Sequence, residues 1–216
     1  TIKNLTLTPK TAANKTIEVM GNNSTIENVI ITPNATDPWG GSIYYCDEIG
    51  FDGTSPKCGD GVANQTVHTL KNVVINNGGV SVRAPEATIN TSGVKLNYTT
   101  NIDWINEYRF YLPYSSTVVN GAPSYTYNVS NALNNIDLVL ATLGDPSTLS
   151  GDETIKLISD LYATHQLTVT APNVTINGAK AAGGYYTIFG NFDKTDNSNN
   201  SVLSVQANGV RINELN

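Results

Sequence analysis

The chain has 216 residues, of which 39% are hydrophobic and only 14% are charged, and its net charge is −6. Nucleic acids and anionic membrane surfaces need clustered positive charge, so an acidic chain with few arginines is a poor candidate for either partner. No apolar run approaches the roughly 20 residues of a membrane-spanning helix, so we expect no membrane span.

The first 33 residues are predicted to form short strands. Thr1–Thr8, Lys15–Met20 and Thr25–Thr32 alternate apolar and polar residues, as half-buried strands do. The phrase Thr-Ile-Lys-Asn at residues 1–4 returns as Thr-Ile-Glu-Asn at 25–28 and as Thr-Leu-Lys-Asn at 69–72. Strand phrases that repeat at a step of roughly two dozen residues indicate a solenoid, because each unit buries its apolar face only against its neighbours.

Residues 34–66 interrupt this pattern and are predicted to form an inserted loop. Cys46 and Cys58 bracket a stretch rich in Gly, Asp and Pro, which favours a disulfide in an oxidising compartment over two unrelated thiols. Oxygen-rich loops can bind Ca²⁺, so this loop and a second stretch are weak calcium candidates, and solvated loops are the alternative. The acidic residues concerned are Asp47, Glu48, Asp52 and Asp60 in the first loop and Asp193 and Asp196 in the second.

Strand character resumes at Val67–Asn76, Val80–Arg83, Ala87–Asn90 and Val94–Tyr98. Residues 99–128 are predicted to be irregular and aromatic. Within them, Trp104–Tyr114 is either a platform on which sugar rings stack or a hydrophobic plug between the strands and the following helix.

One helix is predicted at Ser130–Leu143, where apolar residues recur at helical spacing, Ser130 can act as N-cap and Gly144 can end the helix. Glu153–Tyr162 is compatible with a helix or a strand. Strands then return at Leu167–Ile176, Tyr186–Phe189 and Val202–Leu215.

These features resemble the right-handed parallel β-helix proteins of the pectin-lyase-like superfamily. The resemblance lies in the helix, in Glu153–Leu157 after it, and in the phrase Leu167–Gly178, parts of which repeat residues 82–90. It implies an all-β, right-handed parallel β-helix with one capping helix, to which the interrupted repeat and the two cysteines add an inserted disulfide-tied loop. It implies no activity, because the superfamily includes lyases, hydrolases, adhesins and phage spikes.

Three regions are expected from this reading: strands with the inserted loop over 1–98, an aromatic segment with the helix over 99–150, and further strands over 151–216. Asn4, Asn28 and Asn72 share one position of the phrase, where a left-handed backbone would turn the chain, and Gly178 is expected to take that position later.

Strands begin at Ile2 with no preceding cap and run to Leu215 with no visible stop, so both ends are expected to be open. Open strand edges invite pairing with another chain, and contact between two different faces of identical subunits yields a filament. The candidate self-assembly residues are Ile2, Leu5 and Leu7 at one end and Val210, Ile212 and Leu215 at the other. The chain starts at Thr1 without an initiator Met, so it is expected to be a processed product or an excised fragment. The alternatives to assembly are a piece of a longer tandem-repeat protein and an excised domain whose missing residues cap its ends.

No catalytic residue is predicted. Glycosidases of the usual kind need two carboxylates at a set separation, and the strands are nearly free of them. His68 and His165 precede strands without an acidic neighbour in sequence and are interpreted as surface or turn residues.

Eleven N-x-S/T sequons favour a secreted, glycosylated protein, although Asn in turns beside Thr in strands also creates them. They lie at Asn4, Asn14, Asn22, Asn23, Asn34, Asn64, Asn90, Asn97, Asn128, Asn173 and Asn199.

The sequence therefore predicts an extracellular structural subunit of a filament or surface layer that assembles by stacking strands of successive copies, without catalysis. A carbohydrate-binding or carbohydrate-cleaving β-helix, such as an adhesin or a polysaccharide lyase, is the second hypothesis. A phage or viral spike fragment is the third.

Overall fold

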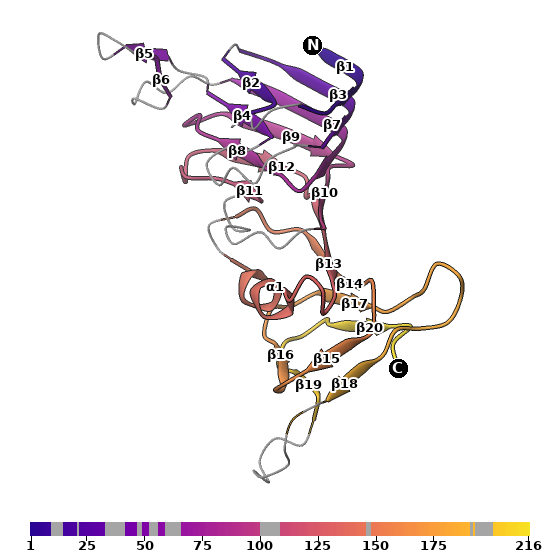
Figure 1. Ribbon diagram of the computed structural model, residues 1–216. Coiled ribbons are helices and arrows are strands. Elements are labelled where there is room, and N and C mark those ends of the chain that lie inside the picture. The colour runs from indigo at the N-terminus through magenta and orange to yellow at the C-terminus, as the bar shows by residue number, and fades with distance from the viewer. Residues whose placement is uncertain are drawn as a thin grey trace. The chain divides into compact units, whose positions relative to one another are not determined.

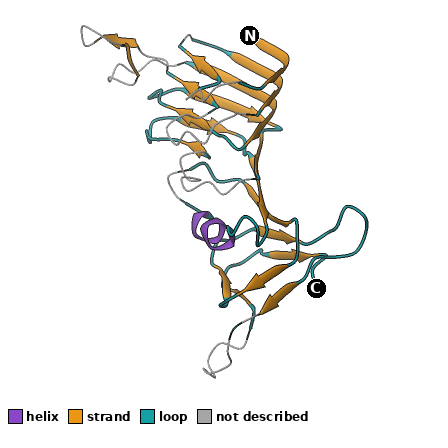
Figure 2. Cartoon of the chain, viewed as in Figure 1, coloured by secondary structure: helices purple, strands orange, loops and turns teal. Residues whose placement is uncertain are grey.

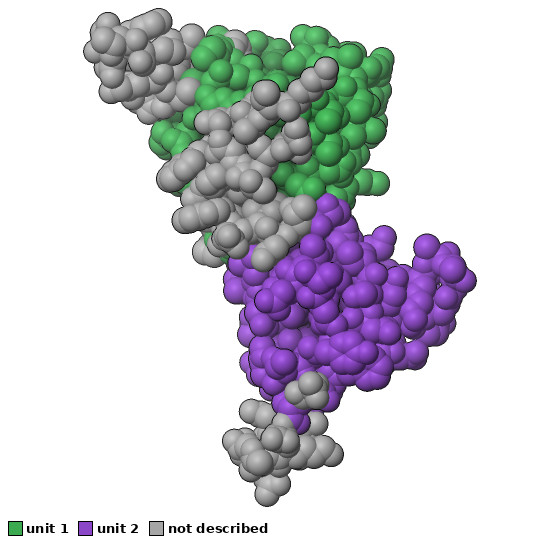
Figure 3. Space-filling view, viewed as in Figure 1, with its two compact units in different colours: residues 1–98, 104–125, 145–151 green, residues 99–103, 126–144, 152–216 purple. Residues whose placement is uncertain are grey.

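The computed structural model describes residues 1–9, 15–20, 22–32, 42–46, 49–51, 56–58, 66–99, 109–145, 148–190, 192 and 201–216, with 49–51 and 56–58 as backbone only. The described part is all-β: mostly parallel strands with one α-helix. It divides into two compact units, coloured separately in Figure 3. Unit 1 comprises Thr1–Tyr98, Trp104–Tyr125 and Asp145–Gly151, and unit 2 comprises Thr99–Asp103, Thr126–Gly144 and Asp152–Asn216.

In the first sheet of unit 1, strands from successive parts of the chain lie side by side, because the chain keeps returning to this sheet (Figure 1). Strand β1 pairs with β3, and β3 with the long β7, all in parallel. The first half of β7 pairs with β9, and β9 pairs with β12. The last residues of β7 pair with β10. The bounds are β1 Ile2–Leu7, β3 Thr25–Ile31, β7 Val67–Asn76, β9 Thr88–Ser92, β10 Lys95–Tyr98 and β12 Val118–Asn120.

A second parallel sheet in unit 1 has the order β2-β4-β8-β11, with bounds Ile17–Val19, Ile43–Tyr45, Val80–Val82 and Phe110–Tyr111. Strand β4 lies inside the predicted loop 34–66, so part of that loop is a buried strand whose three residues are all inaccessible. Beyond it, β5 (Ile49–Phe51) and β6 (Pro56–Cys58) form an antiparallel hairpin.

Strand β13 (Ser124–Val129) spans the boundary between the units, and the strands of unit 2 then form three groups of parallel pairs, of which two are separate two-stranded sheets. Within unit 2, β14 pairs with β17 and β17 with β20, β15 pairs with β18, and β16 with β19. Their bounds are β14 Asp152–Leu157, β15 Leu161–Ala163, β16 Leu167–Val169, β17 Val174–Asn177, β18 Ile188–Gly190, β19 Leu203–Val205 and β20 Arg211–Asn213. Parallel sheets of this kind fit the expected β-helix.

The helix is shorter than predicted. Helix α1 spans Ile136–Thr142 and is drawn in purple in Figure 2. The hydroxyl of Ser130 accepts a hydrogen bond from the backbone N–H of Leu133 at 3.2 Å, so it stabilises the turns before the helix instead of capping it. The end is as expected, because Gly144 has a φ of 72°.

The apolar face of α1 packs into unit 2. Val139 is buried, α1 contacts β16, and Ile136 and Leu140 share a small apolar cavity with Leu167 and Ile176. Burial of this stripe stabilises a helix of only two turns, which would not persist alone in water. The packing is compatible with the predicted capping role.

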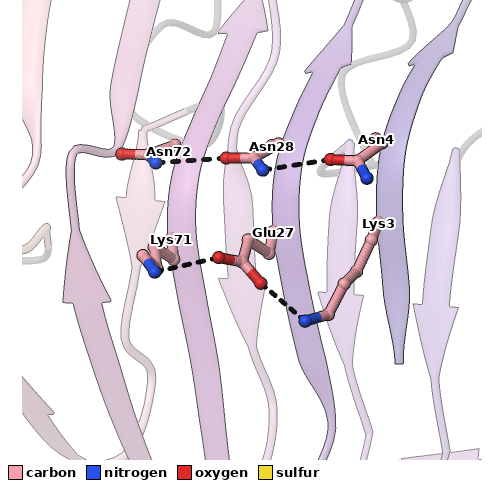
Figure 4. Close-up of polar contacts among 6 residues, drawn as sticks. All are labelled: Lys3, Asn4, Glu27, Asn28, Lys71 and Asn72. Atoms are coloured by element: carbon pink, nitrogen blue, oxygen red, sulfur yellow. Dashed lines mark hydrogen bonds and ion pairs between the residues drawn. The ribbon is translucent and has the colours of Figure 1, made fainter.

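Asparagine turns the chain within the first sheet, as predicted. Asn4, Asn28 and Asn72 have φ values of 56°, 54° and 51°, in the left-handed region that asparagine tolerates better than most residues. The amide Nδ2 of Asn72 donates to Oδ1 of Asn28 at 3.1 Å, and Nδ2 of Asn28 donates to Oδ1 of Asn4 at 3.0 Å (Figure 4). The result is a ladder of amides that joins successive strands.

Gly178 does not take this position, contrary to the prediction. In unit 2 the positive φ falls at Asn173 (61°) and Gly209 (74°). Gly178 is required for another reason: a Cβ there would lie 2.6 Å from the carbonyl oxygen of Glu214, so only glycine allows the strands to approach so closely.

A row of charges lies beside the amide ladder. Glu27 forms ion pairs with Lys3 at 2.7 Å and with Lys71 at 2.9 Å, one lysine from each neighbouring strand (Figure 4). Hydrogen bonds from Lys3 first and Lys71 second lower the pKa of Glu27 from 4.5 to about 2. The carboxylate is therefore charged at all physiological pH values.

Candidate functional site

The end strand of unit 1 exposes apolar side chains that its neighbours bury. Leu5 of β1 lies in register with Val29 and, one strand further, with Val73. Val29 and Val73 are fully buried, whereas Leu5 is 46% exposed. Leu7 and Ile2 are half-buried in the same strand. Leu5 differs from its register partners because no described strand covers the outer side of β1.

The last strand of unit 2 likewise exposes an apolar side chain whose register partner is buried. Ile176 of β17 is buried, and its register partner Ile212 in β20 is 50% exposed. Val169 and Val205, paired between β16 and β19, repeat the contrast, at 0% and 43% exposed. Val210 and Leu215 are half-buried. The structure thus places all six predicted self-assembly residues on or beside the two end strands.

The backbone is also open at these strands. Among the described residues, β1 pairs only with β3 and β20 only with β17. Each therefore has one edge whose N–H and C=O groups face away from the sheet, and such an edge is a template for a further strand.

The open end of unit 1 is hollow. A pocket of about 280 Å³ is lined by apolar side chains, including Ile2, Val19 and Ile26, and by polar residues from the turn before β3. These apolar residues belong to strands whose inner sides form the core, so the pocket is the exposed interior of the first strands.

His68 was interpreted as a surface or turn residue, and this is wrong. It lies within β7, is completely buried, and packs against the ring of Tyr45 at a centroid distance of 4.7 Å. Its Nδ1 accepts the backbone N–H of Ser24 at 3.2 Å and lies 2.8 Å from the Ser24 hydroxyl, which must then donate. The tandem of Ser24 and His68 resembles a nucleophile and its base, but full burial keeps the imidazole from a substrate in solution.

His165 is exposed, as predicted, but it has an acidic neighbour in space. Its Nε2 lies 3.1 Å from Oδ1 of Asp137 in α1, and both side chains are more than half exposed. The sequence does not reveal the pair because the two residues lie on separate elements. Solvent weakens such a contact, so it contributes roughly a few tenths of a kcal/mol to stability when the imidazole is protonated.

Aromatic residues are exposed in unit 2. Tyr162 and Phe189 stack at 4.9 Å with an interplanar angle of 13°, on the adjacent strands β15 and β18. Their rings are 56% and 43% exposed. Of the aromatic segment expected to stack on sugars or plug the core, Trp104 lies outside the described residues, while Phe110 is buried and Tyr114 half-buried, which fits the plug better for this part.

The sequons differ in accessibility. The exposed asparagines are Asn4, Asn22, Asn23 and Asn173, and the half-buried ones are Asn90, Asn97 and Asn128. The amide nitrogen of Asn97 donates to Asn76 at 3.0 Å, so it is poorly placed to carry a glycan. Asn14, Asn34, Asn64 and Asn199 lie outside the described residues.

Several predicted sites lie outside what the structure describes. Cys46 is buried, but the side chain of Cys58 is not described, so the disulfide stays a prediction. The calcium candidates Asp47, Glu48, Asp52 and Asp60, like Asp193 and Asp196, lie outside the described residues. Within the described residues, no three acidic, histidine or cysteine side chains gather closely enough to hold a metal ion.

Within the same part of the chain, no helix combines the length and the apolar character that crossing a membrane requires. In comparisons with protein-family models, with curated proteins and with solved structures, none matches this chain.

Proposed function

We propose that this chain is a structural, non-catalytic subunit: a right-handed parallel β-helix whose end strands stack on other copies to build an extracellular filament or surface layer. The observation that carries the proposal is the exposure of Leu5 and Ile212, at 46% and 50%, in columns whose other members are buried. Full burial of such a side chain contributes roughly 1.5–3 kcal/mol, and each still has about half of its surface to bury.

The polar surface supports a structural role over a catalytic one. Glu27, the carboxylate of the charge row, is held between Lys3 and Lys71, and its pKa of about 2 makes it a poor general acid or base near neutral pH. Ladders of asparagine and ion pairs across strands stabilise a stack without forming a cleft.

An extracellular location follows from the same proposal. A Cys46–Cys58 disulfide next to the hairpin of β5 and β6 would suit an oxidising compartment. Exposed sequons such as those at Asn22 and Asn23 would carry N-linked glycans there.

Carbohydrate binding is the second candidate, and the stacked pair of Tyr162 and Phe189 favours it. Exposed aromatic rings offer apolar surface together with a hydroxyl group, which suits a sugar. The pair also fits a simple cross-strand contact between β15 and β18, so end-to-end assembly remains the leading proposal.

The test is sedimentation velocity with negative-stain electron microscopy of the chain and three lysine variants. Leu5→Lys and Ile212→Lys should abolish filaments, because each places an unpaired charge in the stacking surface. Ile30→Lys is the matched control: Ile30 is 44% exposed but lies on β3, which is covered on both edges, so its filaments should persist. A parent chain that stays monomeric at high concentration contradicts the proposal, and retained binding to a polysaccharide would then support the second candidate.

A further inference from the structure

We propose that residues 209–213 of one copy pair in parallel with residues 4–8 of a second copy, so that Val210 meets Leu5, Ile212 meets Leu7 and Asn213 meets Thr8. The inference rests on the proposed end-to-end assembly and specifies its register. The partner at the exposed edge of β20 is a second copy of this chain.

The two segments are instances of one local pattern. A residue with positive φ is followed by an apolar residue, any residue, a second apolar residue, and then Asn or Thr. The pattern begins at Asn4, Asn28, Asn72, Glu86, Gly93, Asn173 and Gly209, and the φ values at these seven positions lie between 51° and 74°. Residues 4–8 and 209–213 are its first and last occurrences, and each ends a sheet path.

Where two occurrences lie on neighbouring strands, they can stack position on position in the structure. In unit 1, Leu5 pairs with Val29, and Ile31 with Ile75. In unit 2, the pairing of Ile176 with Ile212 places the fourth positions of two occurrences side by side. The proposed contact repeats this arrangement with Ile212 and Leu7, and it covers the exposed sides of Leu5 and Ile212.

The fifth position supplies a polar contact of the same kind. Nδ2 of Asn97 donates to Asn76 at 3.0 Å, and Nδ2 of Asn76 donates to the hydroxyl of Thr32 at 3.1 Å. The end segments carry Asn213 and Thr8 at this position, the residue types of Asn76 and Thr32 in the opposite order. Oδ1 of Asn213 would then accept from the hydroxyl of Thr8, as Oδ1 of Asn76 accepts from Asn97. A second copy therefore brings a partner that the column already accepts.

The first position also fits. Oδ1 of Asn72 lies where a Cβ of Gly93 would be, at 2.7 Å, and Oδ1 of Asn173 lies in the same relation to Gly209, at 2.3 Å. Glycine at these two positions leaves room for the amide from the preceding strand. Placing Asn4 next to Gly209 keeps asparagine and glycine in one column, here with glycine on the earlier strand, and with a left-handed backbone on both sides.

A register shifted by one residue is disfavoured by the alternation of side chains, and a register shifted by two would no longer place the left-handed positions Asn4 and Gly209 side by side. A shift by one residue would turn Leu5 and Leu7 to the outer face and bring Thr6 inward. Charge does not oppose the proposed register, because Arg211 would lie beside Thr6, an exposed neutral residue.

Disulfide trapping tests the register. In the proposed contact Thr6 and Arg211 are direct neighbours on the outer face, and adjacent strands lie about 4.8 Å apart, within the reach of a disulfide. The variant Thr6→Cys with Arg211→Cys should therefore give a ladder of covalent multimers on non-reducing gels after mild oxidation. The control, Thr6→Cys with Asn213→Cys, displaces one cysteine by two residues, which separates the Cα atoms by about 8 Å and should trap at least about tenfold less.

The outcomes separate the register from the assembly itself. If the parent forms filaments and the control pair cross-links as well as the test pair, or better, the register is wrong and the proposed function stands. If the parent remains monomeric in sedimentation at every concentration, the proposed function fails, and the register fails with it. Multimers from the test pair that dissolve on reduction, with few from the control, support both.

Discussion

At the scale of single residues, one backbone requirement recurs along the chain. Asn4, Asn28 and Asn72 adopt a positive φ and also join their amides across strands. Asparagine serves both needs, because its side chain tolerates the left-handed region and carries a donor and an acceptor. Glycine at Gly93 and Gly209 serves only the first need.

Substitution at Asn28 separates these two contributions. Asn28→Gly keeps the favourable φ and loses two amide hydrogen bonds, whereas Asn28→Ala loses the bonds and also strains the backbone. We expect Ala to lower the free energy of unfolding by about 1 kcal/mol more than Gly does. Urea denaturation of both variants at low protein concentration measures the difference. Equal losses would show that the left-handed backbone costs alanine nothing there.

The charge row makes stability depend on pH in a defined window. The pKa of Glu27 falls from 4.5 to about 2 on folding, so its ion pairs stabilise the folded state fully above pH 4.5. This contribution is lost as the pH falls towards 2. We expect Glu27→Gln to flatten that part of the curve of melting temperature against pH.

Lys3→Met is the matched variant for this measurement, because it removes the first of the two partners of Glu27 and leaves Lys71 in place. It should move the low end of the window to higher pH and flatten the curve less than Glu27→Gln does, because Lys71 still lowers the pKa of Glu27. A Glu27→Gln protein whose melting temperature still falls as steeply as the parent's between pH 4.5 and 2 would show that other carboxylates control acid stability.

At the scale of elements, alternation predicts strands well where one side of the strand is buried. Strands β1, β3 and β7 were predicted almost to the residue, since apolar residues alternate along them. Strand β13 is not predicted, although Tyr125, Tyr127 and Val129 alternate with polar residues along it, because the aromatic stretch that precedes it looks irregular. Strand β4, with three buried residues in a row, has no alternation to recognise.

The helix and the histidines show what local sequence does not contain. Helical spacing extends from Ser130, but the chain turns before Ile136, where α1 begins. His68 is polar, so sequence places it on the surface. Only the neighbouring strand supplies the N–H and hydroxyl of Ser24 that make burial of the ring tolerable.

The candidate site was largely predictable, because it depends on repetition. Ile2, Leu5 and Leu7 were expected at one end and Val210, Ile212 and Leu215 at the other, and these residues do lie on or beside the end strands. The register between them was not predictable. The repeated sequence phrase predicts that Gly178 takes the position of Asn28 in a later strand. In the structure, the positive φ values show that Asn173 and Gly209 take this position.

At the scale of the whole molecule, glycosylation and assembly should compete at Asn4. Oδ1 of Asn4 accepts a hydrogen bond from Asn28. Its Nδ2, the atom that an N-linked glycan modifies, is therefore directed away from the ladder, where the second copy would dock. We predict that chains glycosylated at Asn4 cannot accept another copy on β1 and so end a filament.

Thr6→Ala tests this competition, because it removes the sequon of Asn4 while leaving Asn4 in the ladder. Expressed in a glycosylating host, this variant should form longer filaments than the parent, with intact mass reporting the lost glycan. Thr175→Ala is the control: it removes the sequon of Asn173, beside β17, a strand that β14 and β20 cover on both edges. Filaments lengthened equally by both variants would place the glycan's effect elsewhere than on the β1 edge, since of the two sequons removed only that of Asn4 lies on β1.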